Sequence, residues 1–320
     1  MTTTTMDRLA PVQYEALLIQ LAQAMRAGDQ QQSNQVRRAM ELPERELDDT
    51  MMDRFDGLSA DLYMLEDKEY FERIDPAQAT PGRLGRELRE AWNSKKWERV
   101  LALLRKGGAF LSQEQRAYLR AIAYENLGHL RSAFAFMDYA AHQNPADIIY
   151  PYYCLNYLVA LGKNEEAVRE ARAYIADRTT PPVLTIAAAV ALIQTSRDAD
   201  EATADKQIRS ALLALERALG SKTGLDGFPD EVIALGYVSL GFCLELLGDT
   251  EQANIAYQLA LVVDPRNDAA QEALRGRLAS RKQSTPSGIT VPKDASTAVA
   301  TNTSFQTIKA QQIWFATGSD

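Results

Sequence analysis

Residues 234–265 read ALGYVSLGFCLELLGDTEQANIAYQLALVVDP, and this stretch indicates the fold of the chain. Gly248 is suited to end a first helix, because glycine readily adopts the left-handed conformation of a helix C-cap. Gly248-Asp249-Thr250 then supplies an N-cap for a second helix, and Pro265 stops that helix. The stretch therefore predicts a helical hairpin.

Two earlier segments carry matching residues at the same offsets from a turn glycine. The matching residues are Ala121, Tyr124, Gly128, Ala133, Ala140 and Pro145 in one segment, and Gly162, Ala167 and Tyr174 in the other. Gly128 and Gly162 are 34 residues apart, as are Ala133 and Ala167. The alanines are expected where two helices approach closely, since a larger side chain would force the axes apart. Each hairpin must then stack on its neighbours to bury its apolar faces.

This pattern resembles the tetratricopeptide repeat (TPR) family, whose unit is 34 residues long. The segment that begins at Ala234 is similar to the family pattern, with Tyr237 where a tryptophan is usual. The resemblance implies an all-α, right-handed α-solenoid of helical hairpins that works as a non-catalytic, protein-binding scaffold or adaptor. Recognisable copies cover about 114–147, 148–181 and 234–267.

The remaining segments are expected to flank or interrupt the array. Residues 7–75 predict an N-terminal helical cap, made of a hairpin broken at Gly28-Asp29 and a segment that packs across the first repeat through Phe55, Leu58, Leu62, Tyr63 and Leu65. The repeat domain covers 83–278. It includes a degenerate hairpin, 85–106, that turns near Asn93-Ser94, and an irregular one, 182–220, with about ten residues inserted in the turn 196–205. Residues 221–229 add a surface loop, and residues 280–320 predict a disordered tail.

In the family, the first helix of each pair lines a concave groove. The matching offsets select the candidate groove residues Tyr118, Ile122, Glu125, Ile149, Tyr152, Asn156, Leu235, Val238, Phe242 and Glu245. Only Asn156 has the chemistry of a clamp for a C-terminal carboxylate, so the expected ligand is a hydrophobic or helical protein segment. The aromatic cluster 305–315 in the tail could be a motif for a partner, could fold into the chain's own groove, or could be incidental.

The net charge of −8 opposes nonspecific nucleic-acid binding, but the charge is unevenly distributed. Residues 41–75 hold 13 acids and 4 bases, whereas residues 83–120 hold 10 bases and 4 acids. The two stretches could be solvated helix faces, could lie against each other, or the basic one could meet an acidic partner. An alternative function is a self-associating regulator, through Trp92, Trp97 or the tail, or a nucleic-acid-binding one that uses the 83–120 stretch.

Catalytic, cofactor and metal sites have little support in this sequence. The two histidines, His129 and His142, are expected on different surfaces, and the two cysteines, Cys154 and Cys243, are expected as isolated core residues. The acids Asp48, Asp49, Asp53 and Asp56 lack the alternate spacing of a calcium loop and predict a solvated face. The longest nearly apolar run, 183–193, is about half of a bilayer core, and a cytoplasmic protein is expected.

Overall fold

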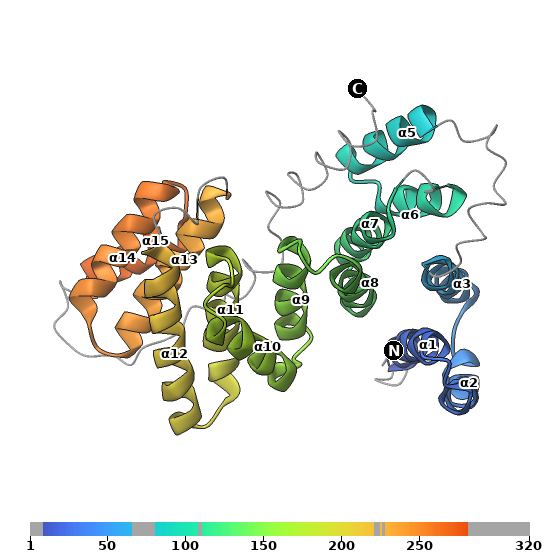
Figure 1. The fold of residues 1–320 in the computed structure, drawn as a ribbon, viewed down its shortest axis with the longest axis horizontal. Helices are drawn as coiled ribbons and strands as arrows, with labels where there is room; N and C mark the ends of the chain where they lie inside the picture. Colours follow the sequence, from blue (N-terminus) through green and yellow to red (C-terminus); the bar gives the residue numbers. More distant parts are fainter. Residues whose placement is uncertain (1–8, 66–80, 108–110, 221–224, 226–227, 281–320) are drawn as a thin grey trace, which may run out of the picture. The chain divides into compact units, whose positions relative to one another are not determined.

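A computed structural model describes residues 9–65, 81–107, 111–220, 225 and 228–280 of the chain, and every regular element in these ranges is helical (Figure 1). The described residues belong to two compact units, one that ends at Tyr150 and one that begins at Pro151. The division falls in the first turn of a helix, α9 (Ile149–Ala160). The all-α fold predicted from the sequence is confirmed.

The first unit contains three N-terminal helices followed by two helical hairpins. Its helices are α1 (Leu9–Arg26), α2 (Gln30–Glu44), α3 (Asp49–Met64), α5 (Pro81–Asn93), α6 (Trp97–Lys106), α7 (Gln113–Asn126) and α8 (Leu130–Gln143). The hairpin predicted to turn near Asn93-Ser94 is confirmed as α5 and α6. Trp92 and Trp97, at the two sides of this turn, pack edge to face with ring centroids 5.3 Å apart.

The second unit continues the series of hairpins from α9. Its other helices are α10 (Asn164–Ala176), α11 (Pro182–Thr195), α12 (Glu201–Leu219), α13 (Asp230–Leu246), α14 (Thr250–Val263) and α15 (Asp268–Ser280), with a short 3₁₀ turn at Ser196–Asp198. α11 contacts α10, α12 and α13 and is buried from Val183 through Ile193. The nearly apolar run of the sequence is therefore the central helix of this unit, buried on all sides.

The turn glycines confirm the alignment of the three segments. Gly128, Gly162 and Gly248 adopt φ values of +83°, +69° and +87°, in the left-handed region that other residues rarely adopt. In each hairpin the glycine amide donates to a carbonyl of the preceding helix, at 2.9 to 3.0 Å. A glycine C-cap is predicted from the sequence at each of these positions, and the left-handed backbone favours glycine there.

The alanines predicted at helix crossings are also confirmed, because Ala121, Ala133, Ala140, Ala167, Ala253 and Ala260 are all fully buried. Gly241 takes the place of Ala121 in the third segment. A Cβ atom on Gly241 would lie 2.8 Å from a ring carbon of Tyr257, so only a glycine lets this tyrosine lie against α13.

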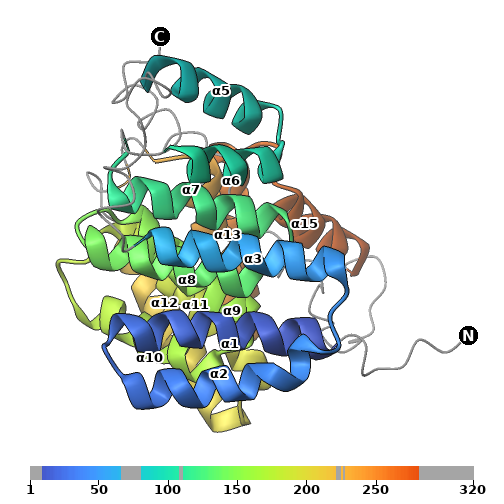
Figure 2. The ribbon, with the colours of Figure 1, turned by 90° about the vertical axis from the view of Figure 1, so that its right-hand side faces the viewer.

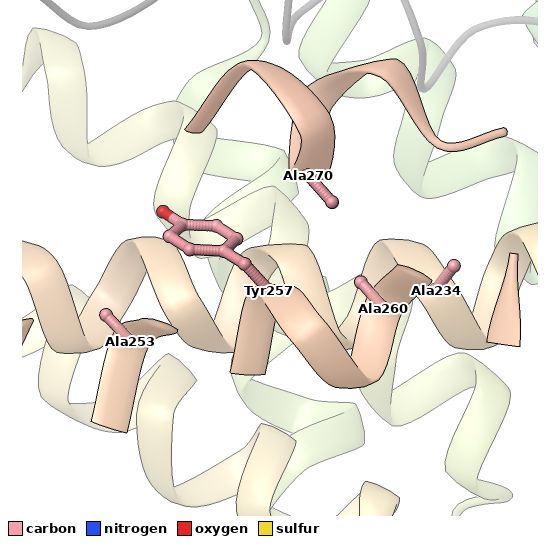
Figure 3. Close-up of a cluster of buried hydrophobic side chains, with 5 residues drawn as sticks. All are labelled: Ala234, Ala253, Tyr257, Ala260 and Ala270. Carbon is pink, nitrogen blue, oxygen red and sulfur yellow. The ribbon is translucent and has the colours of Figure 1, made fainter. Parts of the chain in front are cut away.

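Figure 3 shows the cluster that this packing creates, with Tyr257 of α14 among Ala234 of α13, Ala253 and Ala260 of α14, and Ala270 of α15. The Tyr257 hydroxyl donates to Glu245 at 3.0 Å, which satisfies the polar end of an otherwise apolar side chain. Helix α15 therefore covers the last hairpin through small residues.

The irregular hairpin differs from its prediction. Of the ten inserted residues expected in the turn 196–205, the last five are helical, because α12 begins at Glu201. Asp200 caps this helix by accepting from the Thr203 amide at 3.0 Å. Ala211 consequently lies ten residues into α12, whereas its counterpart Ala167 lies three residues into α10. The insertion mainly lengthens a helix rather than a loop.

The N-terminal helices pack on the second helices of the two following hairpins, since α3 contacts α6 and α1 contacts α8 (Figure 2). Phe55, Leu58, Leu62 and Leu65 are buried as predicted, but Tyr63 is 59% exposed. The cap expected across the first repeat thus extends over two hairpins. Most of the predicted 221–229 loop and the tail beyond Ser280, including the aromatic cluster 305–315, lie outside the described residues.

Candidate protein-binding surface

The candidate groove residues of the first recognisable copy lie on α7 and are deeply buried. Tyr118 and Ile122 have no exposed surface, and Glu125 is 8% exposed. The Tyr118 ring lies 6.0 Å from the ring of Tyr150, measured between centroids. These side chains are positioned on the first helix of a hairpin, as the repeat pattern implies, but in this structure they are core.

The candidates of the second copy lie on α9, which is unusually aromatic. Tyr152 is buried, and its ring meets that of Tyr153 edge to face at 5.8 Å, while Tyr153 and Tyr157 are 6.0 Å apart. Tyr152 and Ile149 are among the residues predicted from the sequence, but the tyrosines at positions 150, 153 and 157 are not. Their clustering within eight residues was visible in the sequence and could have indicated an aromatic helix.

Asn156 lies one helical turn beyond Tyr152 and is 6% exposed. No acceptor among the described residues lies within hydrogen-bonding distance of its side-chain nitrogen, Nδ2, although this atom is buried. An unsatisfied buried amide costs about 1 to 3 kcal/mol, so such a group is rarely retained without a use. Asn156 therefore stands out from the apolar side chains around it.

The candidates of the third copy lie on α13 and are the most accessible. Leu235, Val238 and Phe242 are all partly exposed, and they follow one another at spacings of three and four residues along the same face. Glu245, one turn further, accepts the hydroxyl of Tyr257. α13 thus presents an apolar stripe that ends at Glu245, whose carboxylate is already hydrogen-bonded to Tyr257 within the hairpin.

A buried polar centre, absent from the sequence-based candidates, lies where α3 meets α6 and α7. Its members are Asp61, Arg105, Arg120 and Tyr124. Asp61 has no exposed surface and accepts four hydrogen bonds: Oδ1 from Nε of Arg105 and Nε of Arg120, both at 3.1 Å, and Oδ2 from Nη2 of Arg105 and the Tyr124 hydroxyl, both at 2.7 Å. Burial, followed by the charge of Asp61, raises the pKa of Tyr124 well above its usual range.

A second carboxylate, Glu15 of α1, anchors the N-terminal helices to α8. It accepts from both the hydroxyl and the amide of Ser132, and from Nη2 of Arg54 at 3.5 Å. His129, the N-cap residue of α8, lies close to this group, and burial followed by the charge of Arg54 lowers its pKa. The expectation that the 41–75 and 83–120 stretches lie against each other is confirmed for Asp61, Arg105 and Arg120.

These contacts also weaken the nucleic-acid interpretation of the 83–120 stretch. Arg105 and Arg120 are engaged by Asp61, and Glu87 pairs with Arg83 at 3.1 Å and with Arg99 at 3.0 Å. Arg116 is buried, and this burial lowers its pKa to about 10. Half of the bases in the stretch are thus paired or buried within the unit, which leaves a smaller positive surface than the sequence suggested.

The reactive side chains are dispersed. His129 and His142 lie at opposite ends of α8, about 20 Å apart along the helix axis, so they cannot act on one group. Cys243 is buried as predicted, but Cys154 is only partly buried. Within the described ranges, no group of three or more His, Cys, Asp and Glu side chains is placed to hold a metal ion. The same ranges contain no helix with the length and apolar character that a membrane crossing requires.

No protein-family model matches the chain, and no curated protein matches it. Solved structures show distant likeness. MamA (residues 41 to the end) from Desulfovibrio magneticus RS-1 is 18% identical, with a TM-score of 0.42 over 59% of this chain and 98% of that one. A thermophilic TPR protein of Thermus thermophilus, TTC0263, is 17% identical, with a TM-score of 0.43 over 64% of this chain and 98% of that one.

The apo form of the quorum sensor NprR from B. thuringiensis is 13% identical, with a TM-score of 0.44 over 93% of this chain and 90% of that one. The hairpins of this chain carry the repeat pattern in their own geometry: left-handed glycines 34 residues apart, at Gly128 and Gly162, and buried alanines at the crossings. The described residues therefore form a TPR-like helical repeat.

Proposed function

We propose that the protein is a non-catalytic scaffold that binds a hydrophobic or helical protein segment on the first helices of its hairpins. The observation that carries this proposal is Asn156, whose buried Nδ2 has no acceptor within the described part of the chain. A bound segment would supply a backbone carbonyl, and so would remove the cost of that unsatisfied donor.

The apolar stripe of α13 supports the same function. Leu235, Val238 and Phe242 are partly exposed on a first helix, the helix on which the resemblance to the TPR family leads us to expect the ligand-binding face. Aromatic and aliphatic side chains at helical spacing suit an apolar ligand face, since they give a large contact area with few rotatable bonds. Tyr118 and Ile122 are fully buried, so their contribution would be to support the face rather than to touch a ligand.

The occupant is a segment of another protein or the chain's own residues 305–315. The tail segment has apolar side chains of the required kind: Phe305, Ile308, Ile313, Trp314 and Phe315. Capture of partners from the native cell by the full chain and by a chain that ends at Ser280 separates the two. A partner gained on truncation identifies the tail as a competitor, whereas a partner lost identifies the tail as part of the binding site.

Two substitutions test the face itself. Asn156→Leu removes the unsatisfied donor, and Phe242→Ala removes the aromatic side chain of the apolar stripe on α13. Each should weaken binding of a captured partner by about 30-fold, the effect of losing an interface hot spot. Leu213→Ala is the matched control, because Leu213 is 67% exposed on α12, a second helix. Equal affinity of all three variants for the partner would show that binding takes place elsewhere.

A further inference from the structure

The surroundings of Asp61 have the chemistry of a complete carboxylate-binding site. A carboxylate has about four lone-pair positions, and each oxygen of Asp61 accepts two hydrogen bonds from Arg105, Arg120 and Tyr124. Arg105 binds both oxygens through Nε and Nη2, the bidentate geometry that guanidinium groups use for carboxylates. The donors all belong to α6 and α7, and the acceptor belongs to α3.

A glycine in helix α3 lets this carboxylate approach its donors closely. Gly57, one turn before Asp61, lies directly over Arg105, and a Cβ atom there would be 2.8 Å from Nη2 of that arginine. The missing side chain lets the helix approach until Asp61 reaches the guanidinium group. Asp61 is fully buried and Arg120 is 1% exposed, so the pair is shielded from solvent when α3 is in place.

The site has more donor capacity than Asp61 uses. Nη2 of Arg120 is buried and has no acceptor in the described residues, although Nε binds Asp61 and Nη1 binds the Arg116 carbonyl at 3.4 Å. A ligand with a second acceptor near its carboxylate would satisfy this nitrogen. The arrangement therefore suits an anionic ligand at least as well as it suits α3.

We propose that Arg105, Arg120 and Tyr124 form a binding site for a carboxylate on an acidic helix, and that Asp61 makes α3 the site's internal ligand. Helices α1–α3 are then a displaceable cap, which an acidic helix of a partner protein replaces. Charge supports this ligand class, since the cap's own sequence, 9–65, carries 10 acids and 5 bases, and the site lies in a stretch, 83–120, of 10 bases and 4 acids. This site is on α6 and α7 and is separate from Asn156 and α13.

The way the cap is attached is consistent with displacement. Two of its polar anchors, Asp61 and Glu15, are carboxylates that accept from groups on α6, α7 and α8, and a third is the Leu65 carbonyl, which accepts from the Tyr139 hydroxyl at 3.0 Å. Buried ion pairs add little net stability over apolar contacts but strongly favour one arrangement over others. Residues 66–80 separate α3 from α5, so release of the cap leaves the hairpins connected in their own order.

Native-state amide exchange of the full chain carrying Asp61→Asn tests the cap. The amide nitrogen replaces one carboxylate oxygen and so faces two donors. Helices α1–α3 should therefore exchange at least about tenfold faster, while α13 and α14 exchange at their wild-type rate. Asp53→Asn is the matched control, since Asp53 is exposed on the same helix. Unchanged exchange in α1–α3, or faster exchange throughout the chain, would overturn the proposal.

A synthetic peptide of residues 49–65 tests the ligand class. It should bind the Asp61→Asn protein at least about tenfold more tightly than the wild-type protein, whose site is filled by its own α3. A peptide that itself carries Asp61→Asn should bind neither, and adding Arg120→Met to the protein should abolish binding of the first peptide. Absence of binding, or equal binding of both peptides, contradicts a carboxylate site. Asn156→Leu and Phe242→Ala should leave binding of this peptide unchanged. A failure of the proposed function can therefore be distinguished from a failure of the carboxylate site.

Discussion

The N-terminal and C-terminal helices of the described chain pack on their neighbours through different kinds of contact. At the N-terminal end, α3 is attached to α6 and α7 by a buried carboxylate with two arginines and a tyrosine. At the C-terminal end, α15 and α14 pack on α13 through alanines around Tyr257 (Figure 3). The first attachment adds charge and direction to the apolar packing of α3, and the second depends on volume.

This difference follows from what each interface must specify. Small apolar residues let helices approach closely, but they penalise any change in volume. A buried ion pair contributes little net stability yet cannot be broken without leaving an uncompensated charge. The C-terminal contact is therefore suited to permanent packing, and the N-terminal contact to a cap whose carboxylate another carboxylate can replace.

The largest effect is expected when the polar centre is broken. Arg120→Met should destabilise docking of α1–α3 by about 3 to 5 kcal/mol, because Asp61 loses a buried counter-charge. Native-state amide exchange of α3 measures this free energy. Replacing the whole centre (Asp61→Leu, Arg105→Met, Arg120→Met and Tyr124→Phe) should restore most of it, since well-packed apolar groups often substitute for a buried ion pair. Failure of this rescue would show that the centre is not separable from the packing around it.

The thiol of Cys243 reports how completely the C-terminal hairpin excludes water. Burial raises its pKa from 9.0 to about 12, so its thiolate population at pH 8 should be about a thousandfold smaller than that of an ordinary thiol. Reaction with a thiol reagent at pH 8, measured in a Cys154→Ser variant, should therefore be limited by unfolding. The Cys243→Ser variant, which retains the partly buried Cys154, should react faster. Equal rates for the two variants would contradict a dry α13–α14 interface.

A smaller effect is expected from adding one methyl group to that interface. Gly241→Ala places a carbon 2.8 Å from the Tyr257 ring, and the overpacking should exceed the gain in helix propensity by about 1 kcal/mol. Urea denaturation followed by circular dichroism measures the change. Gly276→Ala in α15 is the control, because a Cβ atom there meets nothing within 4 Å and should be neutral or stabilising. A stabilised Gly241→Ala variant would show that Tyr257 can move.

The smallest difference in stability is expected between variants at the N-cap residues of α2 and α14, Asp29 and Asp249. Asp29 accepts from the Gln32 amide at 2.8 Å, and Asp249 accepts from the Gln252 amide at 3.1 Å. Alanine at either position should cost about 1 kcal/mol, since the two caps have the same geometry. Thermal unfolding of the two variants checks this. Costs that differ by more than the measurement error would mean that the two ends also differ in local helix stability.

Much of the repeat could be predicted because its determinants are local. These determinants act within one hairpin and recur at fixed offsets in the sequence: left-handed glycines such as Gly128, capping residues such as Asp249 and alanines at helix crossings such as Ala253. The candidate ligand-binding residues on α7, α9 and α13 follow from the resemblance to the TPR family, and their role in binding stays a prediction. Their accessibility could not be predicted, because Tyr118 and Phe242 occupy equivalent helices but differ in burial according to which neighbours cover them.

The sequence by itself thus determined the hairpins, their spacing and the uneven charge of the N-terminal third. Only the tertiary structure decided that Asp61 is the buried one among the acids of 41–65, the part of this stretch that the structure describes. Asp61 is separated from Arg105, Arg120 and Tyr124 by 44, 59 and 63 residues, so no local pattern pairs them. The pairing arises because α3 crosses α6 at Gly57, where the absence of a side chain lets one carboxylate reach two guanidinium groups away from water.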